Sequence, residues 1–174
     1  MKIERLSDQV CSMARAVAVV GDPWTLMILR ELFLGSRRFE TIREQTGISP
    51  QLLSRRMKDL VAEEIVQRVT YSERPVRHEF RLTAKGADLW PVLITLKAWG
   101  DRHLSSPQDN YLLELTHRDC GHLANPHLAC PACHALVSPM DMDATMSPAM
   151  IEDRQARGAA NSQTLARTRR TKAG

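Results

Sequence analysis

Apolar residues recur at helical spacing along the first third of the chain. One such pattern covers residues 8–20 and ends at Gly21. The next begins after Asp22, a good helix cap, and Pro23, which suits a first helical turn, and it ends at Gly35. We expect this second helix to be buried on a wide face.

Two shorter amphipathic helices are predicted on either side of a tight turn at residues 46–49. Gly47 supplies the left-handed position where the first helix ends, and Ser49 with Pro50 begins a helix over residues 50–62. The inward face of this second helix has apolar residues at positions i, i+4 and i+7, namely Leu53, Met57 and Leu60. This arrangement is typical of a helix-turn-helix.

Two β-rich segments follow at residues 65–71 and 77–82, separated by a turn at 72–76. A long helix is then predicted over residues 84–103, with a kink or break near residue 90 because Pro91 lies inside the pattern. The apolar seam of this helix consists of Leu89, Leu93, Leu96 and Trp99. The order of elements predicts a mainly α protein with a small β-wing, which is a winged helix-turn-helix.

The composition changes after the winged-helix pattern, which covers residues 8–104. A polar linker at 105–110 leads to a small Cys/His unit at 111–139, which we expect to be zinc-ribbon-like. Residues 140–174 are rich in Met, Ala and Arg, and they predict a flexible tail with transient helix at 148–158. No internal repeat is evident in the sequence.

The overall composition is ordinary for a globular protein, with 43% hydrophobic and 25% charged residues. A net charge of +4 and a pI of about 9.1 mildly favour an anionic partner. The first residues lack the apolar segment of a secretory signal, and the longest apolar run, residues 16–20, is too short to span a bilayer. We therefore expect a cytoplasmic protein without membrane contact, in which the four cysteines are reduced.

The outer face of the helix at 50–62 carries the short polar and basic side chains that a recognition helix needs. Gln51 can pair with adenine and Arg55 with guanine, whereas Arg56 and Lys58 are better placed for phosphates. The remaining predicted contacts come from the helix start, its outer face and the wing, namely Ser49, Ser54, Arg74 and Arg77, with His78 a weaker one. Each arginine alone could be a solvated surface charge, but the coincidence of turn, caps, inward stripe and basic face favours double-stranded DNA as the partner.

Four segments carry a family resemblance: Cys11, GDPWTLMILRELFLGSRRFETI, GISPQLLSRRMKDLVAEEIVQRVTY and RPVRHEFRLTAKGADLWPVLITLKAWG. In these segments, residues 11–104 resemble the HxlR-type regulators, relatives of the MarR-type winged-helix proteins. The resemblance implies a homodimeric transcription factor whose terminal helices build the dimer, with each wing and recognition helix contacting one half-site. The chain departs from the family pattern at Pro23, usually basic, at Val76, usually a second wing proline, and at Phe80, usually tyrosine. The change at Val76 implies a more mobile wing.

The apolar seam of the helix at 84–103 leaves two possibilities open, because it could close onto the protein's own core or onto a second copy. We favour a homodimer, since a monomer with one short recognition helix makes too few base contacts for useful specificity. Two half-sites about one helical turn apart would then form a palindromic operator. The sequence identifies no operator, target gene or small-molecule effector, and it does not separate an activator from a repressor.

His117, Cys120, Cys130 and Cys133 follow the spacing H-x2-C-x9-C-x2-C. A two-residue gap lets both side chains of a pair bind one ion from a tight turn, and two such knuckles complete a tetrahedral zinc site. Protein groups fill all four positions, which predicts a structural ion, and some HxlR-like proteins carry a similar Cys-rich appendage. The alternative is a loop of reduced thiols. The reserve ligands are His122, His127 and His134.

Cys11 stands apart from the other cysteines, with Arg15 one turn along the same helical face. A nearby cation would favour the reactive thiolate, and the resemblance to HxlR-type regulators implies a cysteine here that senses oxidants or electrophiles. A small buried core residue is the alternative interpretation. Both interpretations stay open at the level of the sequence.

These features favour a DNA-binding transcriptional regulator over two other classes of protein. The chain contains no H-E-x-x-H, no G-x-S-x-G and no phosphate-binding glycine loop, so we do not expect an enzyme. A protein-interaction adaptor built on a winged helix and a zinc knuckle is the alternative function, but it would fit better with an acidic or apolar recognition helix. Salt-sensitive binding to duplex DNA would separate the regulator from the other two classes.

Overall fold

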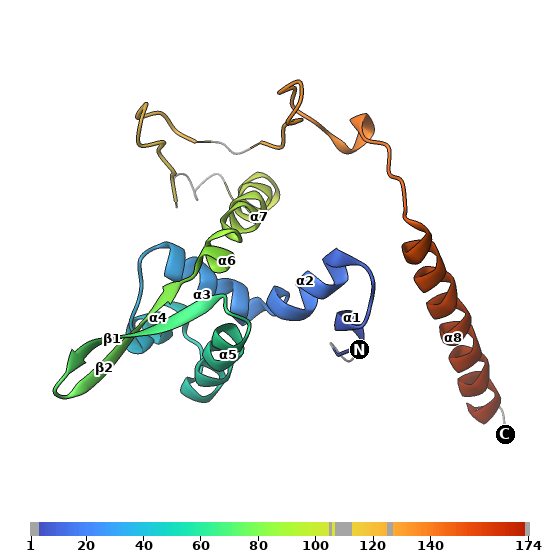
Figure 1. Cartoon of the computed structure of the whole chain (residues 1–174), viewed down its shortest axis with the longest axis horizontal. Coiled ribbons are helices and arrows are strands. Elements are labelled where there is room, and N and C mark those ends of the chain that lie inside the picture. The colour runs from blue at the N-terminus through green and yellow to red at the C-terminus, as the bar shows by residue number, and fades with distance from the viewer. Residues whose placement is uncertain (1–3, 105, 107–112, 125–126, 173–174) are drawn as a thin grey trace. The chain divides into compact units, whose positions relative to one another are not determined.

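The computed structural model describes residues 4–104, 106, 113–124 and 127–172. Two units divide the chain, residues 1–22 with 142–174 and residues 23–141. The elements, in chain order (Figure 1), are α1 (Glu4–Ser7), α2 (Ser12–Val20), α3 (Pro23–Phe33), α4 (Phe39–Thr46), α5 (Pro50–Ala62), β1 (Val66–Glu73), β2 (Val76–Leu82), α6 (Ala84–Ala87), α7 (Trp90–His103), a 3-10 turn (Pro139–Asp141) and α8 (Pro148–Lys172). All of the predicted linker at 105–110 except Ser106 lies outside the described residues.

The core of the second unit lies where α3, α4 and α5 meet the start of β1. The predicted inward face of α5 is confirmed, since Leu53, Met57 and Leu60 are all buried. The neighbouring elements contribute further side chains that are almost fully buried, namely Ile28, Leu29, Ile42, Ile48 and Val66. Each such aliphatic side chain stabilises the fold by roughly 1.5–3 kcal/mol relative to an exposed one. Burial of this shared face holds the short helices in place.

The turn between α4 and α5 forms as its local chemistry predicts. Gly47 has a left-handed backbone (φ 71°), and its N–H donates to the Arg43 carbonyl at 2.9 Å. Ser49 caps α5 by accepting a hydrogen bond from the Leu52 N–H, and Pro50 occupies the first helical turn. These contacts orient α5 relative to α4, which is what a recognition helix requires.

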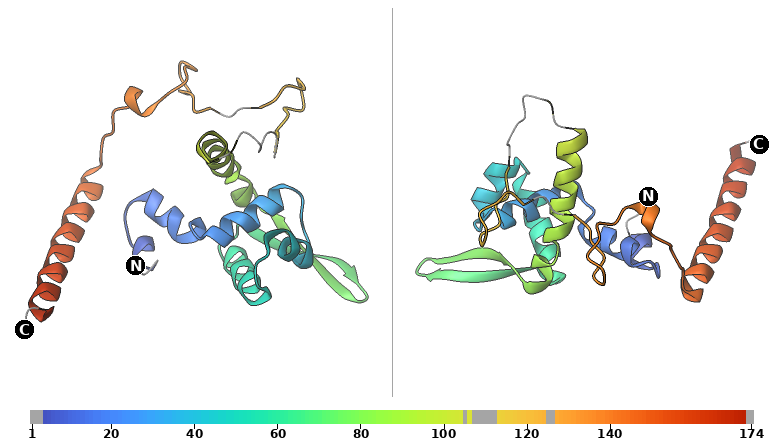
Figure 2. Two further views of the ribbon diagram at one scale, coloured as in Figure 1. Left: turned by 180° about the vertical axis from the view of Figure 1, so that it is seen from behind. Right: turned by 90° about the horizontal axis from the view of Figure 1, so that it is seen from above.

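The wing is a two-stranded antiparallel ribbon of β1 and β2, with an irregularity between Thr70 and Ser72. Figure 2 shows this ribbon projecting beyond the helices of its own unit. The strands are longer than predicted, so the connecting turn contains only Arg74 and Pro75. The Phe80 N–H donates to the carbonyl of Arg37 at 2.8 Å, and this bond ties β2 to the segment that precedes α4.

The predicted helix at 84–103 is broken at Asp88 and Leu89, which confirms the break expected from Pro91. The first piece, α6, packs tightly on the base of the wing. An added Cβ at Gly86 would lie 2.1 Å from the Ile65 carbonyl oxygen, so only glycine allows this approach. Sequence periodicity did not indicate this close contact.

The second piece, α7, buries Ile94 and contacts α3. Three apolar side chains at positions i, i+4 and i+7, Val92, Leu96 and Trp99, are about half exposed, at 50%, 48% and 53% of their area. The predicted seam is therefore split, because Leu93 is partly buried while Leu96 and Trp99 belong to the exposed stripe. The rings of Trp99 and His103 lie in contact with centroids 5.4 Å apart and planes tilted by 47°.

The first unit contains α1, α2 and α8. The final helix α8 runs over 25 residues, from Pro148 to Lys172, and is much longer than the helix predicted at 148–158. Flexibility of residues 140–174 stays a prediction. Among the described helices, none combines the length and the apolar character needed to cross a membrane.

Candidate nucleic-acid interface

The outward face of α5 carries a polar stripe opposite the buried one. Gln51, Arg55 and Lys58 lie at positions i, i+4 and i+7 and are all exposed. An amide and two cations on one face offer both a base-pairing group and phosphate partners. All three are predicted site residues, and they form the centre of the exposed face.

The side chains beside this stripe are less exposed to solvent. Ser54 and Arg56 are both partly buried, and the side chain of Arg56 is only 22% exposed. The Arg56 guanidinium lies 3.6 Å from the carboxylate of Asp59, one turn along α5. Exposed ion pairs of this kind are weak, but this one orients Arg56 along the helix. Lys58 is consequently the more accessible cation for a phosphate.

The start of α5 presents Ser49, whose side chain is exposed while its oxygen accepts the Leu52 N–H at 3.4 Å. The predicted capping role of Ser49 is therefore confirmed, while its contact with a phosphate stays a prediction. The first turn of α5 keeps few donors for a phosphate, because Pro50 has no N–H and the Leu53 N–H donates to the Ser49 carbonyl at 2.9 Å.

The wing presents two of the predicted arginines at its tip. Arg74 and Arg77 are both exposed, and the turn between them is held by a 3.0 Å hydrogen bond from the Ser72 hydroxyl to the Pro75 carbonyl. His78, the weaker prediction, is partly buried, and its Nδ1 lies 3.0 Å from the Thr70 hydroxyl. The tip is thus basic, and His78 serves cross-strand pairing.

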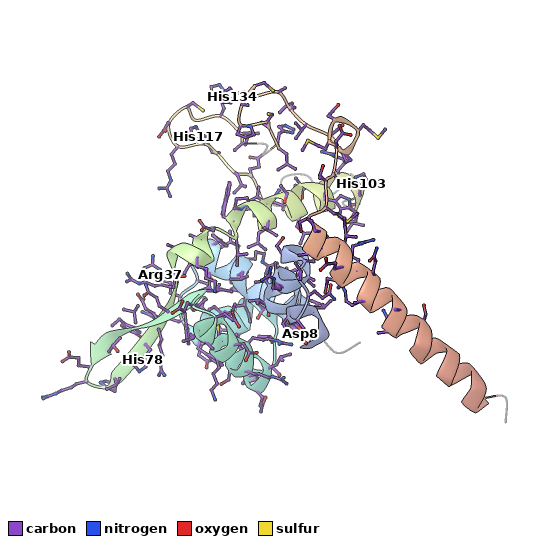
Figure 3. The ribbon with its side chains drawn as sticks, turned by 45° about the vertical axis from the view of Figure 1, so that its right-hand side comes forward. Asp8, Arg37, His78, His103, His117 and His134 are labelled. Atoms are coloured by element: carbon purple, nitrogen blue, oxygen red, sulfur yellow. The ribbon has the colours of Figure 1, made fainter. Side chains whose placement is uncertain are left out.

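Two further arginines were missed in the sequence. Arg37 and Arg38 are exposed in the segment before α4, and Arg38 occupies the N-cap position of that helix. The Arg38 guanidinium lies 5.3 Å from the ring centre of Tyr71, a cation–π contact with β1. Figure 3 labels Arg37 at the base of the wing and His78 along it. In the sequence, two adjacent arginines directly before the first helix of the helix-turn-helix could have indicated these two cations.

A buried carboxylate supports this segment. Glu31 is 5% exposed, and its Oε1 accepts hydrogen bonds from Nε and Nη2 of Arg30 at 3.0 and 2.7 Å. Its Oε2 accepts the Ser36 hydroxyl at 3.1 Å, and the Ser36 N–H donates to the Glu31 carbonyl. Because Ser36 precedes Arg37 directly, Glu31 fixes the point from which both arginines project.

The Cys/His unit contains two separate pairs of predicted ligands. His117 Nδ1 lies 3.3 Å from Cys120 Sγ. Hydrogen bonds from the backbone of Cys133 and of Ala132, and from the Cys133 side chain, lower the pKa of Cys130, against a smaller opposing effect of burial. Within the described residues no three His, Cys, Asp or Glu side chains form one group, so the four ligands are seen as two pairs.

Cys11 occupies the N-cap position of α2 and is partly exposed, with a free thiol. The Arg15 guanidinium, expected beside the thiol, donates instead to the Val10 carbonyl at 2.9 Å. The predicted thiolate partner is thus engaged with the backbone. Cys11 is not a fully buried core residue either.

Comparison with known proteins identifies the family of the helix-turn-helix and its wing. The family model of HxlR-like helix-turn-helix proteins matches residues 19–108, which include the turn, the recognition helix and the wing. This chain belongs to the HxlR-like helix-turn-helix family. An uncharacterized HTH-type transcriptional regulator of Mycobacterium tuberculosis, Rv3095, is 43% identical over 122 residues, which cover 70% of this chain and 77% of the relative. The HTH-type transcriptional regulator YodB of Bacillus subtilis is 36% identical over 91 residues, 52% of this chain and 81% of YodB.

Solved structures agree with the winged-helix fold of this HxlR-like chain. The crystal structure of PA1607, a candidate transcription factor, matches with a TM-score of 0.73 and 26% identity over 82% of this chain and 99% of that one. The redox regulator HypR in its oxidized form matches with a TM-score of 0.51 and 27% identity over 55% of this chain and all of HypR. The family and its relatives are DNA-binding transcriptional regulators rather than enzymes. This confirms the expectation of a transcriptional regulator and the expectation that the chain is not an enzyme.

Proposed function

We propose that this HxlR-like regulator acts as a homodimer that binds a palindromic operator through α5 and the wing. The observation that carries the proposal is the exposed stripe of Gln51, Arg55 and Lys58, opposite the buried face of α5. The wing adds Arg74 and Arg77 at its tip. Base-pairing groups at the centre and cations on the wing are the distribution that direct readout with phosphate anchoring needs.

The exposed stripe of α7 supports a second copy as the partner of that helix. Val92, Leu96 and Trp99 present apolar surface directly opposite the face that buries Ile94. Apolar stripes of this kind on an element that is already packed on its other side mark interaction surfaces. A two-fold axis through α7 would place two recognition helices on successive half-sites.

DNA binding is tested by mapping genomic sites, deriving the palindrome and measuring affinity by fluorescence anisotropy at several salt concentrations. Arg55→Ala should cost about 1–3 kcal/mol on the operator and relax specificity at one base pair. Lys58→Ala and Arg56→Ala should weaken all duplexes alike and lower the salt slope, each by about one for a lost phosphate contact. Arg102→Ala, an exposed arginine of α7, is the matched control. Equal loss with Arg55→Ala on every sequence would overturn the base-contact role.

Dimerisation is tested by analytical ultracentrifugation of the full chain. Leu96→Asp should convert a dimer into a monomer, because the new charge would be buried in the apolar contact. Asp101→Lys should leave the dimer intact, because Asp101 is exposed and lies about 140° from Leu96 around α7. A wild-type chain that sediments as a monomer at micromolar concentration contradicts the proposal, whatever the variants do.

We further propose that Cys11 makes this regulator responsive to oxidants. The support is the partly exposed free thiol at the start of α2, together with the similarity to HypR, a protein described as a redox regulator. Oxidation by diamide would join the Cys11 sulfur to a second thiol in a disulfide. The two thiols give up two electrons and two protons, which reduce the N=N bond of diamide to a hydrazine. Unchanged DNA release by diamide in Cys11→Ser would refute this role.

A further inference from the structure

The Cys/His unit consists of two copies of one turn. In residues 115–124 the N–H of His117 donates to the His122 carbonyl at 2.9 Å, and in residues 128–137 the N–H of Cys130 donates to the Ala135 carbonyl at 2.9 Å. Two further hydrogen bonds repeat with the same offset along the chain, Gly121 to His117 as His134 to Cys130, and Ala124 to Leu115 as Val137 to Leu128. The short β-bridges repeat as well, Thr116 with Leu123 and Ala129 with Leu136.

The backbone conformation repeats together with the hydrogen bonds. The residue that follows the second ligand of each turn is left-handed, with φ 71° at Gly121 and φ 59° at His134. Glycine adopts this conformation readily and histidine does so at a cost. The second turn therefore keeps the shape of the first although its residue type disfavours it. The sequence indicated the ligand spacing of both turns, but the repeated hydrogen bonds and the repeated left-handed residue became evident only in the structure.

The first and fourth positions of both turns are metal-ligand types. They are His117 and Cys120 in the first turn, and Cys130 and Cys133 in the second. The His117 Nδ1 and Cys120 Sγ atoms are 3.3 Å apart, close to the separation of about 3.5 Å that two ligands of one tetrahedral Zn²⁺ have at usual bond lengths.

The same repeat excludes the reserve ligands. His134 matches Gly121 and His122 matches Ala135, so neither histidine has a ligand-type residue at the corresponding position of the other turn. His127 lies before the second turn begins. Only one set of four residues is therefore shared by both turns.

The unit has no apolar core that could hold the two turns together. None of the described residues between 113 and 138 is buried, and the equivalent leucines Leu123 and Leu136 are 63% and 67% exposed. Units this small fold with the help of a metal or of disulfides. The four cysteines of the chain are free thiols.

We propose that residues 115–124 and 127–137 form a zinc ribbon in which one Zn²⁺ joins the two turns through His117, Cys120, Cys130 and Cys133. Each turn supplies two ligands, and the ion does the work that a hydrophobic core does elsewhere. Figure 3 labels His117 and His134, one in each turn, and only His117 is a ligand. The four protein ligands leave no position for water, so the ion is structural.

The test is the metal content of the full-length chain after purification without chelators, followed by exchange with Co²⁺. We expect one zinc per chain, and a tetrahedral cobalt spectrum with thiolate charge-transfer bands. Cys130→Ser and Cys133→Ser should lose the metal. His134→Gly and His122→Ala, the matched controls, should keep it, and His117→Cys should keep it with a stronger thiolate band.

Two results would overturn the proposal. One is a chain that carries less than about a tenth of an equivalent of zinc and gives no tetrahedral cobalt spectrum, since structural zinc binds far too tightly to be lost in gentle purification. The other is loss of metal from His134→Gly or His122→Ala together with retention in Cys130→Ser. Circular dichroism of every variant shows whether the helices of the winged-helix core stay folded, so that metal loss is attributed to the Cys/His unit itself.

Discussion

Replacing each of two helical glycines of this regulator by alanine should change the free energy of unfolding in opposite directions. At Gly86, in α6, an added Cβ would lie 2.1 Å from the carbonyl oxygen of Ile65 and 3.1 Å from its carbonyl carbon. At Gly100, in α7, the same atom would meet nothing within 4 Å. Both positions are helical, so helix propensity favours alanine equally, and only the tertiary contact differs.

The contact at Gly86 cannot relax easily. The Ile65 carbonyl also accepts the N–H of Thr83 at 3.0 Å, and the Thr83 hydroxyl accepts the Gly86 N–H at 3.0 Å. Moving α6 away would strain or break both bonds. Overpacking typically costs about 1–3 kcal/mol and each lost hydrogen bond about 0.5–1.5 kcal/mol, so Gly86→Ala should destabilise by roughly 3 kcal/mol. Gly100→Ala should stabilise by about 0.5–1 kcal/mol.

Urea unfolding followed by tryptophan fluorescence measures both effects, with an unchanged m-value as the check that the compactness of the end states is the same. Thermal melts should agree, because 1 kcal/mol corresponds to about 4–8 °C in a domain of this size. Gly86→Ala should therefore melt at least about 10 °C lower. A neutral or stabilising Gly86→Ala beside a stabilising Gly100→Ala would refute the reasoning about the α6 contact.

Three further predictions concern single side chains. Glu31→Ala should lower the free energy of unfolding by about 1–3 kcal/mol, because the buried hydrogen bonds from Arg30 and Ser36 are lost. Glu31→Gln should lower it less. Equal stability of the alanine variant and the wild type in urea would contradict this. Ser49→Ala should lower the free energy of unfolding by about 0.5–2 kcal/mol through loss of the helix cap. Ser49→Asp keeps an acceptor and should retain most of the wild-type stability. A stability loss in Ser49→Asp as large as that in Ser49→Ala would exclude capping as the cause. The hydroxyl and N–H of Ser138 hold the pKa of Asp141 below its usual value. A lowered pKa means that the stabilisation of this turn is full above the pKa of the unfolded chain and is lost as pH falls through the folded value. An NMR titration of the Asp141 carboxyl carbon should thus have its midpoint below that of the Ser138→Ala variant, and coincident midpoints would reject the cause.

Much of the winged helix was predictable because its signals are local. The turn at Gly47, the cap at Ser49 and the break before Pro91 depend on backbone preferences within a few residues. The inward stripe of α5 followed from helical periodicity. Each of these predictions is confirmed.

The candidate site was only partly predictable. The types of residue on α5 indicated a DNA-binding face, but the partial burial of Arg56 and its pairing with Asp59 depend on neighbours in space. Arg38 was missed, since its contact with Tyr71 joins segments far apart in the chain. Burial of Glu31 was missed for the same reason, because a carboxylate is placed inside only when the fold supplies its donors.

The sequence by itself determined the order of elements, their caps and turns, the inward face of the recognition helix and the spacing of the Cys/His pairs. Those features depend on residues within about one helical turn of each other, where stereochemistry and hydrogen bonding act directly. Tertiary structure alone decided that Gly86 must lack a side chain, that the exposed stripe of α7 is Val92, Leu96 and Trp99, and that the two Cys/His turns repeat. Exposure and contact are properties of packed elements, and periodicity cannot say which of two apolar faces the core takes.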